Sequence, residues 1–328
     1  MTSPNPPYLA RPLPGVSPPS HKQVSQCLIS FGSNLGDRFD LIAVAAEEIS
    51  RWDVISNEKP LETSRLFETP PIGGPGGQEP FLNAVGAFET TAPAREILHR
   101  LQQLEDRLGR QRRRRWDARS IDLDVVLHGR LVGGASGLVV PHPRYTARRF
   151  VLQPACDVVP HFRDPRFGWT MRELHDHLLE EAPSRARHWI TVIARTDLPT
   201  TRNRTRHPVS TPARLHRHVA IERHATETAW VTDGLPGAPH QFSSRSTAKG
   251  AAASMPRLLV RLHRVEENLR WPAPHLMWPG GWQWPEYRLE CSDIDWAIRE
   301  LASAYDSMRC EATPVSEDGS WWFPESTE

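Results

Sequence analysis

The spacing of apolar residues along the chain predicts short strands alternating with amphipathic helices. Residues 27–31 (CLISF) and 81–89 (FLNAVGAFE) are apolar runs of the length expected of buried strands. Residues 38–51 and 94–108 place apolar side chains three and four positions apart, which is typical of a helix with one buried face. Asp37 suits the start of the first helix as an N-cap.

A third apolar run, residues 121–127 (IDLDVVL), predicts another strand. We expect a further strand at 138–140 and helices at about 150–156 and 169–180. The resulting order of strand, helix, strand, strand, helix, strand matches a split βαβ arrangement. The predicted fold class is therefore α+β, a ferredoxin-like sandwich with an antiparallel sheet, helices on one face and extra strands.

Two carboxylates occupy one face of the third predicted strand. Asp122 and Asp124 are two residues apart, so their side chains project from the same side. Like charges on an apolar strand are costly to bury without a partner, and a hard cation that takes oxygen ligands is the obvious one. Magnesium is the first candidate, because it usually completes its coordination with substrate phosphates. A solvated strand end is the simpler interpretation and stays open.

Arginines crowd the segment before this strand. Residues 110–116 read RQRRRRW, and Arg119 follows them. Guanidinium groups form forked hydrogen bonds with phosphate oxygens, so carboxylates and arginines together indicate a metal-nucleotide site. A nucleic-acid or localisation patch is the alternative. The formal net charge of the whole chain is only +1, which argues against a general polyanion binder and makes the arginine cluster a local field.

Residues suited to a flat ligand lie in the proline-rich loop 69–77 and shortly after it. Phe81 and Asn83 share a strand face and suit a heterocycle that needs stacking and a polar edge. A core Phe beside a strand-end Asn is the simpler alternative. In the loop itself, the backbone groups of Thr69 and Ile72 are left free for a ligand or water.

Four other polar residues are candidates with ordinary alternatives. His142 is held between two prolines, and with Arg148 it adds donors suited to phosphate, although a lone loop histidine is more often inert. Gln102 and Glu105 lie three apart on one flank of a predicted helix, where surface residues are common.

The composition divides the chain into four parts. We expect a disordered leader at 1–25, a main domain at 26–189, a flexible linker at 190–254 and a small tryptophan-rich αβ module of unknown fold and function at 255–328. The linker is rich in Arg, His, Thr, Ser, Pro and Ala, for which an RNA-binding tail is the alternative. The last part holds a predicted strand and helix, and either packs its own aromatics or forms a partner-docking or oligomerisation surface.

Cysteine usage predicts a reducing location, and the hydropathy predicts no membrane-spanning segment. The four cysteines form no CxxC pair, so neither a disulfide framework nor a zinc site is indicated, and the cytoplasm fits best. No apolar run reaches transmembrane length, and the mean hydropathy is -0.51. Prolines also occupy the leader where a signal peptide needs its apolar core.

Five landmarks in order identify a resemblance. They are GSNLGDR at 32–38, ETPPIG at 68–73, PFLNA at 80–84, RSIDLDVVL at 119–127, and VPHPR followed by RRFVL, ending at 152. With them, the chain from about 26 to 180 resembles the 6-hydroxymethyl-7,8-dihydropterin pyrophosphokinase family of folate biosynthesis. The resemblance implies a ferredoxin-like enzyme that transfers the diphosphate of ATP to the pterin hydroxymethyl group, releasing AMP, and that requires two magnesium ions.

The same resemblance assigns roles by position. The metal ligands would be Asp122 and Asp124. The catalytic residues would be these two aspartates together with Arg110 and Arg112. The pterin would contact Thr69, Pro70, Ile72, Phe81, Asn83 and Phe150. The ATP would contact Gln102, Glu105, Arg112, Trp116, Arg119, Val125, His142 and Arg148.

Three departures from the family pattern are visible. Asp117 stands where glycine is usual, the loop at 73–77 is longer and richer in glycine, and Phe81 replaces a common tyrosine. None removes a metal or phosphate ligand. The implied partners are small-molecule substrates, with no membrane and no nucleic acid. A non-catalytic ferredoxin-like module that binds nucleotide or RNA is the alternative for the whole chain.

Overall fold

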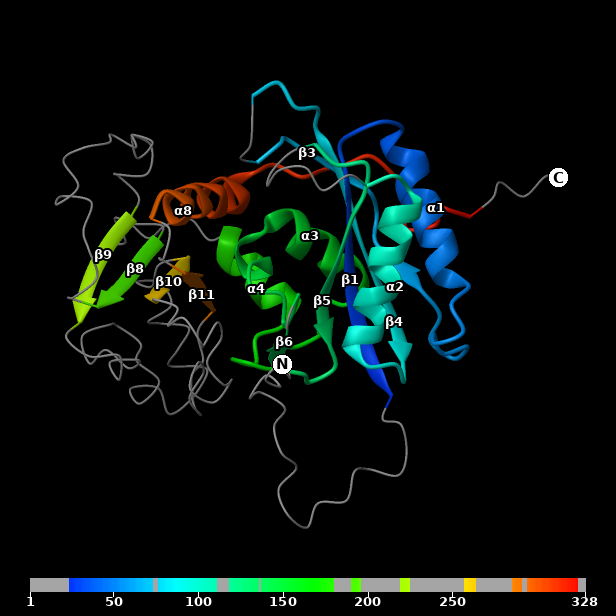
Figure 1. Cartoon of the computed structure of the whole chain (residues 1–328), viewed down its shortest axis with the longest axis horizontal. Coiled ribbons are helices and arrows are strands. Elements are labelled where there is room, and N and C mark those ends of the chain that lie inside the picture. Colours follow the sequence, from blue (N-terminus) through cyan, green and yellow to red (C-terminus); the bar gives the residue numbers. More distant parts are fainter. Residues whose placement is uncertain are drawn as a thin grey trace, which may run out of the picture.

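The computed structural model describes residues 24–72, 76–110, 118–135, 137–179, 190–195, 219–224, 257–263, 285–290 and 294–323 (Figure 1). Nearly all of the leader predicted at 1–25 therefore lies outside the described residues. The same holds for most of the range predicted as a linker, for most of the tryptophan-rich stretch at 271–285, and for residues 111–117 of the arginine run.

An antiparallel sheet forms the centre of the main domain. Its strand order is β12-β3-β4-β1-β5, with β2 paired to β4. All five strand pairings described in this sheet are antiparallel. The strands are β1 (Ser25–Ser33), β2 (Glu62–Thr63), β3 (Phe67–Thr69), β4 (Phe81–Thr90), β5 (Asp122–His128) and β12 (Thr313–Pro314). This confirms the α+β class and the predicted strands of the main domain.

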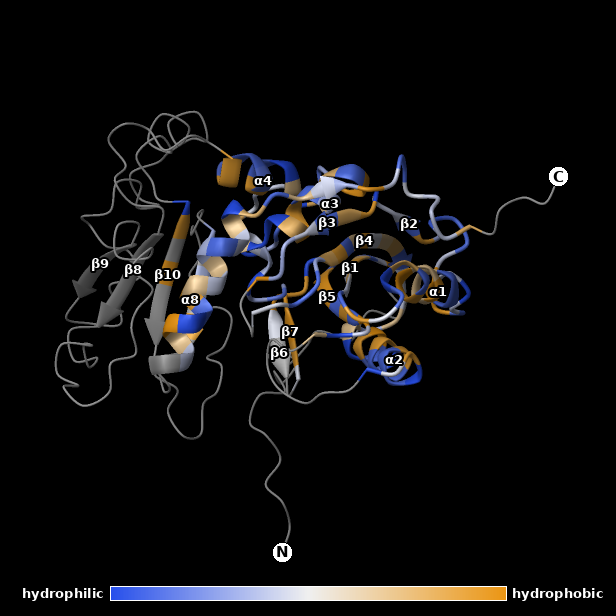
Figure 2. Ribbon diagram, turned by 90° about the horizontal axis from the view of Figure 1, so that it is seen from above, coloured by the Kyte–Doolittle hydropathy of each residue, from blue (hydrophilic) through white to orange (hydrophobic). Residues whose placement is uncertain are grey.

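Helices cover both faces of this sheet (Figure 2). On one face, α1 (Arg38–Ser50) and α2 (Ala94–Arg107) bury apolar side chains such as Ile42 and Leu101 against strands β1, β4 and β5. On the other, α3 (Arg149–Val158) and α4 (Met171–Leu179) pack against the opposite side chains of the same strands. The predicted helical layer on one face corresponds to α1 and α2. The structure adds a second layer, α3 and α4, on the other face. As predicted, the Asp37 side chain caps α1 by accepting from the Asp40 N–H.

A hairpin and a short helical turn follow β5. The hairpin consists of β6 (Gly133–Ala135) and β7 (Leu138–Val140), and the turn is the 3-10 helix η1 (Tyr145–Ala147). Tyr145 is fully buried and donates its hydroxyl to Asp164 at 2.5 Å, while Arg166 pairs with the same carboxylate. This buried network fixes η1, the segment between β7 and α3.

The C-terminal part contains a second, parallel sheet with the order β11-β10-β8-β9 and the helix α8 (Ile294–Arg309). The strands are β8 (Ile190–Arg195), β9 (Val219–His224), β10 (Leu258–His263) and β11 (Glu286–Glu290). The strand and helix predicted for this part are confirmed as β10 and α8. However, β8 and β9 lie inside the predicted linker at 190–254, so that prediction needs correction at these two strands.

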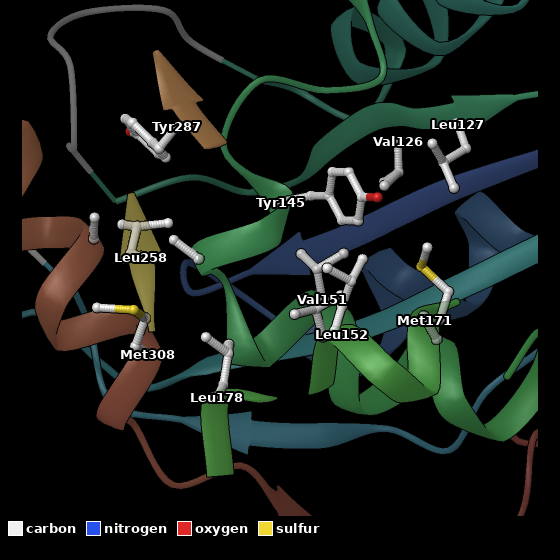
Figure 3. Packing of buried hydrophobic residues seen from close by; sticks show 14 of the residues in the cluster. Val126, Leu127, Tyr145, Val151, Leu152, Met171, Leu178, Leu258, Tyr287 and Met308 are labelled. Atoms are coloured by element: carbon white, nitrogen blue, oxygen red, sulfur yellow. The ribbon is translucent and has the colours of Figure 1, made fainter. Parts of the chain in front are cut away.

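The second sheet and α8 share a core with the main domain. Leu258, Tyr287 and Met308 belong to the same buried cluster as Val151 and Leu152 of α3 (Figure 3). The cause is that α3 and η1 expose apolar side chains that the antiparallel sheet does not cover. The C-terminal part therefore packs onto the main domain, although the sequence suggested a module beyond a linker.

In the described part of the chain, no helix combines the length and the apolar character needed to cross a bilayer. Cys27, Cys156 and Cys310 are free and buried, and burial raises the pKa of Cys156 and of Cys310 to about 11.

Gly86 in the middle of β4 provides a test of the sheet packing. A Cβ there would lie 2.8 Å from Leu61 Cδ1 and 3.1 Å from Phe31 Cε2, so the core has no room for it. We expect Gly86→Ala to lower the free energy of unfolding in urea by about 1–3 kcal/mol through overpacking. Gly133→Ala is the control, because nothing lies within 4 Å of its Cβ. Equal stability of the two variants would contradict this packing.

Candidate active site

Asp122, the first residue of β5, is enclosed by arginines. Its Oδ1 accepts from Arg110 Nη2 at 2.7 Å, and its Oδ2 pairs with Arg119. Arg110 also pairs with Glu105 of α2, whose side chain is 1% exposed and accepts the Leu123 N–H at 2.8 Å. Arg110 is therefore held between two carboxylates, and its position is fixed by both α2 and β5.

Asp124 faces a second set of basic groups. Its Oδ2 lies 3.8 Å from Arg148 Nη1 and 3.8 Å from His142 Nε2. Burial and the neighbouring charges of Arg148 and Arg144 hold the pKa of His142 well below its usual value, so the ring is neutral at pH 7. Its Nδ1 accepts the backbone N–H of Arg144 at 3.2 Å, which places the ring proton on Nε2, toward Asp124. The two aspartates thus lie among basic groups from several segments.

A cavity of about 100 Å³ opens beside Asp122. All of the residues predicted to bind the pterin line it, namely Thr69, Pro70, Ile72, Phe81, Asn83 and Phe150. Asn83 Nδ2 donates to Thr69 Oγ1 at 2.8 Å, so the amide orientation is set and its Oδ1 is the acceptor. Two aromatic rings and a fixed carboxamide in one cavity suit a flat heterocycle with a polar edge.

Charged residues form the other part of the same cavity lining. Asp122, Arg119 and Arg148 line it, so three of the predicted phosphate and metal residues meet the predicted pterin residues there. Asp124, Arg110 and His142 are not among the lining residues. The Arg148 guanidinium also lies 5.5 Å from the Phe150 ring centroid, in a cation–π arrangement. The cavity therefore joins an aromatic slot to an anion-binding edge.

Several residues of this site were not predicted. The cavity lining also includes Gly32, Gln78, Ser303 and Ser307. A Cβ on Gly32 would lie 3.5 Å from Asn83 Oδ1, at ordinary van der Waals distance from the cavity residues. The GSNLGDR motif signalled Gly32, whereas α8 lies far along the chain and carried no signal for Ser303 or Ser307.

The end of β1 holds the arginine segment in place. Asn34, 1% exposed, accepts the Arg119 N–H on its Oδ1 at 2.8 Å and donates its own backbone N–H to the Arg119 carbonyl at 3.0 Å. Ser33 Oγ donates to the Ser120 carbonyl at 2.6 Å. Asn34 Nδ2 also bonds Gln78 Oε1 at 3.1 Å. Ser33 and Asn34 therefore position both Arg119 and one wall of the cavity.

Some predicted residues lie elsewhere. Gln102 lines a second cavity on the outer flank of α2, together with Leu98, His99 and Leu138. Val125 is buried in the core of the sheet. Glu105 is also buried and forms an ion pair with Arg110. Arg112, Trp116 and Asp117, as well as Gly73 of the glycine-rich loop, lie outside the described residues.

The donor set for a metal is small. Among the described residues, no group of three or more His, Cys, Asp or Glu side chains could hold an ion. Two carboxylates on one strand face are nevertheless what magnesium commonly uses, because it takes one or two carboxylates and completes its shell with waters and substrate phosphates. Asp122 and Asp124 therefore fit a cation that arrives with a nucleotide.

Comparison with known proteins identifies the family. The family model for 7,8-dihydro-6-hydroxymethylpterin-pyrophosphokinase (HPPK) matches residues 28–160. A Bacillus subtilis protein named 2-amino-4-hydroxy-6-hydroxymethyldihydropteridine pyrophosphokinase is 36% identical over 130 residues, which are 40% of this chain and 75% of that protein. The chain belongs to the HPPK family. Every residue to which a site role was assigned lies within the range that the HPPK model matches.

Two further similarities concern longer proteins. The Pneumocystis carinii "Folic acid synthesis protein fol1" is 36% identical over 152 residues, which are 46% of this chain. The chain spans only 20% of that fungal protein. A solved structure of a Plasmodium falciparum HPPK-DHPS triple mutant with pteroate is 10% identical, with a TM-score of 0.36, and the match covers 54% of this chain and 52% of that one.

The buried Glu105–Arg110 pair gives a test of how the site is held. Glu105→Gln keeps the acceptor for the Leu123 N–H but leaves Arg110, whose side chain is 13% exposed, without one of its charged partners. We expect this variant to lose about 2 kcal/mol of unfolding free energy. The control is Glu96→Gln on the same helix, because Glu96 is 41% exposed and its pair with Arg100 should be worth less than about 1 kcal/mol. A larger loss in the control would contradict the assignment.

Proposed function

We propose that the cavity and the Asp122–Asp124 edge form one active site, in which the chain transfers the diphosphate of ATP to the hydroxymethyl oxygen of 6-hydroxymethyl-7,8-dihydropterin. The products are AMP and the pterin diphosphate, and the reaction is a step of folate biosynthesis. The observation that carries the proposal is that one cavity is lined both by the expected pterin residues and by Arg119, Asp122 and Arg148. Membership of the HPPK family supports it independently.

The pterin ring would lie between Phe81 and Phe150. Stacking on aromatic faces holds a planar heterocycle without fixing its rotation in the plane. The Asn83 carboxamide supplies that direction, because its Nδ2 is already bonded to Thr69 and its Oδ1 can accept from a ring N–H. Backbone groups of Thr69 and Ile72 are proposed as further edge contacts.

The triphosphate would replace the aspartates as the partner of the arginines. Arg110 and Arg119 now pair with Asp122, and Arg148 lies 3.8 Å from Asp124. Phosphate oxygens accept the same forked hydrogen bonds, so ATP can take over these guanidinium groups. His142, neutral with its proton on Nε2, adds a donor that does not depend on pH near neutrality. Glu105 would act by holding Arg110 instead of touching the nucleotide.

Asp122 and Asp124 would hold magnesium, with two ions as the proposed number. When bound, magnesium neutralises phosphate charge and lowers the pKa of a coordinated hydroxyl. The chain's own contribution is alignment, because little covalent chemistry is required of a protein in phosphoryl-type transfer. The pterin hydroxyl oxygen forms a bond to the β-phosphorus while the bond from that phosphorus to the AMP oxygen breaks. Asp122 is the proposed relay for the hydroxyl proton, and its position in the cavity lining supports this role.

Other parts of the proposal rest on the sequence. Arg112 and Trp116 are expected in a loop that closes over the phosphates, and Gln102 near the nucleotide. A cytoplasmic location is proposed because Cys27, Cys156 and Cys310 are free thiols. Small molecules are the proposed binding partners. The non-catalytic nucleotide- or RNA-binding module remains the alternative, and the next experiment separates the two.

Asp122→Asn should abolish turnover while leaving the fold intact. With hydroxymethyl-dihydropterin, ATP and magnesium, a coupled assay should show AMP release by the wild type and a rate about 10³-fold lower in the variant. Asp53→Asn is the control, because Asp53 is 80% exposed and remote from the cavity. A folded wild-type chain that releases no AMP would refute the enzyme, and an Asp122→Asn variant that binds polyanions more tightly without any change in rate would favour the binding module.

A further inference from the structure

One wall of the cavity comes from outside the range that the HPPK model matches. Ser303 and Ser307, about one turn apart on α8, line it together with Phe150 and Arg148. The matched range ends at residue 160, so α8 is an addition to the family domain. Ser307 is 3% exposed, which places it inside the fold and not on a helix surface that happens to pass nearby.

Apolar packing fixes α8 against the elements that carry the site. Ala304 and Met308 of α8 lie in one buried cluster with Tyr145 of η1 and with Val151 and Leu152 of α3. Figure 3 shows Met308 and Leu258 within this cluster. Since α3 begins at Arg149, directly after Arg148, the position of α8 is tied to the segment that supplies two lining residues.

A buried ion pair joins α8 to the phosphate-binding side. Glu300 is 3% exposed, and its Oε1 accepts from Arg144 Nε at 2.9 Å and from the Tyr287 hydroxyl at 2.6 Å. A carboxylate buried to this extent needs such partners. Arg144 in turn donates its backbone N–H to His142. Burial lowers the pKa of the Arg148 guanidinium, and the charge of Glu300 is among those that oppose this lowering.

The segment after α8 fastens the opposite side of the cavity. β12 (Thr313–Pro314) extends the sheet beyond β3, the strand that carries Thr69. Leu66 N–H donates to Ser316 Oγ at 2.8 Å, and the indole N–H of Trp321 donates to the Ser64 carbonyl at 2.7 Å. We name residues 313–322 the clasp.

Gly319 allows the clasp to approach the main domain this closely. Thr63 Oγ1 donates to the Gly319 carbonyl at 2.5 Å and accepts from the Trp322 indole N–H at 2.7 Å. A Cβ at Gly319 would lie 1.9 Å from the Thr63 carbonyl oxygen, a backbone atom that cannot move aside without displacing β2. Any other residue at this position must therefore push the clasp away.

We propose that α8 is a built-in wall of the pterin pocket, in which Ser303 and Ser307 face the bound pterin and the clasp keeps the wall in place. The inference rests on the proposed function, because the pterin is its ligand. Serine leaves room for a ring and offers a hydroxyl to its edge, whereas a larger apolar side chain would fill that room. Ser303 and Ser307 are thus specificity-determining residues contributed by the C-terminal part.

The test is a comparison of two substitutions on one helix in the full-length chain. Ser303→Leu should raise the KM for hydroxymethyl-dihydropterin about 10-fold or more and leave the KM for ATP within about twofold. Arg299→Leu, which places the same leucine at an exposed position of α8, should alter neither. The same variants are compared by equilibrium titration of the pterin, followed by its fluorescence, with magnesium and a non-hydrolysable ATP analogue present. This titration needs no turnover.

A second pair of variants tests the clasp. Gly319→Ala should weaken pterin binding about 10-fold although it touches no lining residue, whereas Gly133→Ala should bind as the wild type does. If thermal unfolding shows that Ser303→Leu does not fold, the pterin affinities of Gly319→Ala and Gly133→Ala test the proposed wall instead.

Each outcome has one meaning. Pterin affinities of Ser303→Leu and Gly319→Ala equal to those of their controls overturn the wall and leave the proposed function standing. A wild-type chain that binds pterin but releases no AMP refutes the transfer reaction, and the wall is then judged by the titrations alone. A wild-type chain that binds no pterin refutes the proposed function itself.

Discussion

The site depends on the pairing of Asp122 with Arg110 and Arg119. Two like-charged aspartates on an apolar strand need counter-charges, which Arg110 and Arg119 supply to Asp122 and Arg148 supplies to Asp124. Glu105 below Arg110 and Asn34 beside Arg119 keep those guanidinium groups in position. A ligand that brings phosphate and a divalent cation would satisfy both partners separately, because phosphate oxygens suit the guanidinium groups and the cation suits the carboxylates.

The rest of the fold serves to place this pairing beside an aromatic slot. β5 runs next to β1, and β4 lies on the other side of β1, so Phe81 and Asn83 on β4 come close to Asp122. The layers of α1 and α2 on one face and α3 and α4 on the other keep the sheet rigid. α8 lines a side of the cavity, and the clasp is proposed to hold α8 in place. The C-terminal part therefore contributes lining residues to the pocket.

Local patterns were sufficient to predict most of the main domain. Alternation and helical spacing predicted β1, β4, β5, α1 and α2, because each buries one face or lies fully inside. The motifs also carried most of the cavity lining, including the pterin residues. The contribution of α8 could not be found in this way. Ser303 and Ser307 carry no sequence signal as helix residues, and long-range contacts of α8, such as the packing of Met308 in one cluster with α3, bring them to the pocket. β12 was missed for a similar reason, since two residues carry no periodicity and its pairing with β3 is a long-range contact.

The central claim is that one cavity receives both substrates around Asp122 and Asp124. A crystal structure of the full chain with magnesium, dihydropterin and an ATP analogue whose α–β bridge is a methylene group tests it most directly, because that bridge is the bond the reaction breaks. We expect metal density on both aspartates, Arg110 and Arg119 turned onto phosphate oxygens, and the pterin between Phe81 and Phe150 with Ser303 against its edge. A nucleotide bound elsewhere, with the Arg110–Asp122 pair intact and the cavity empty, would contradict it.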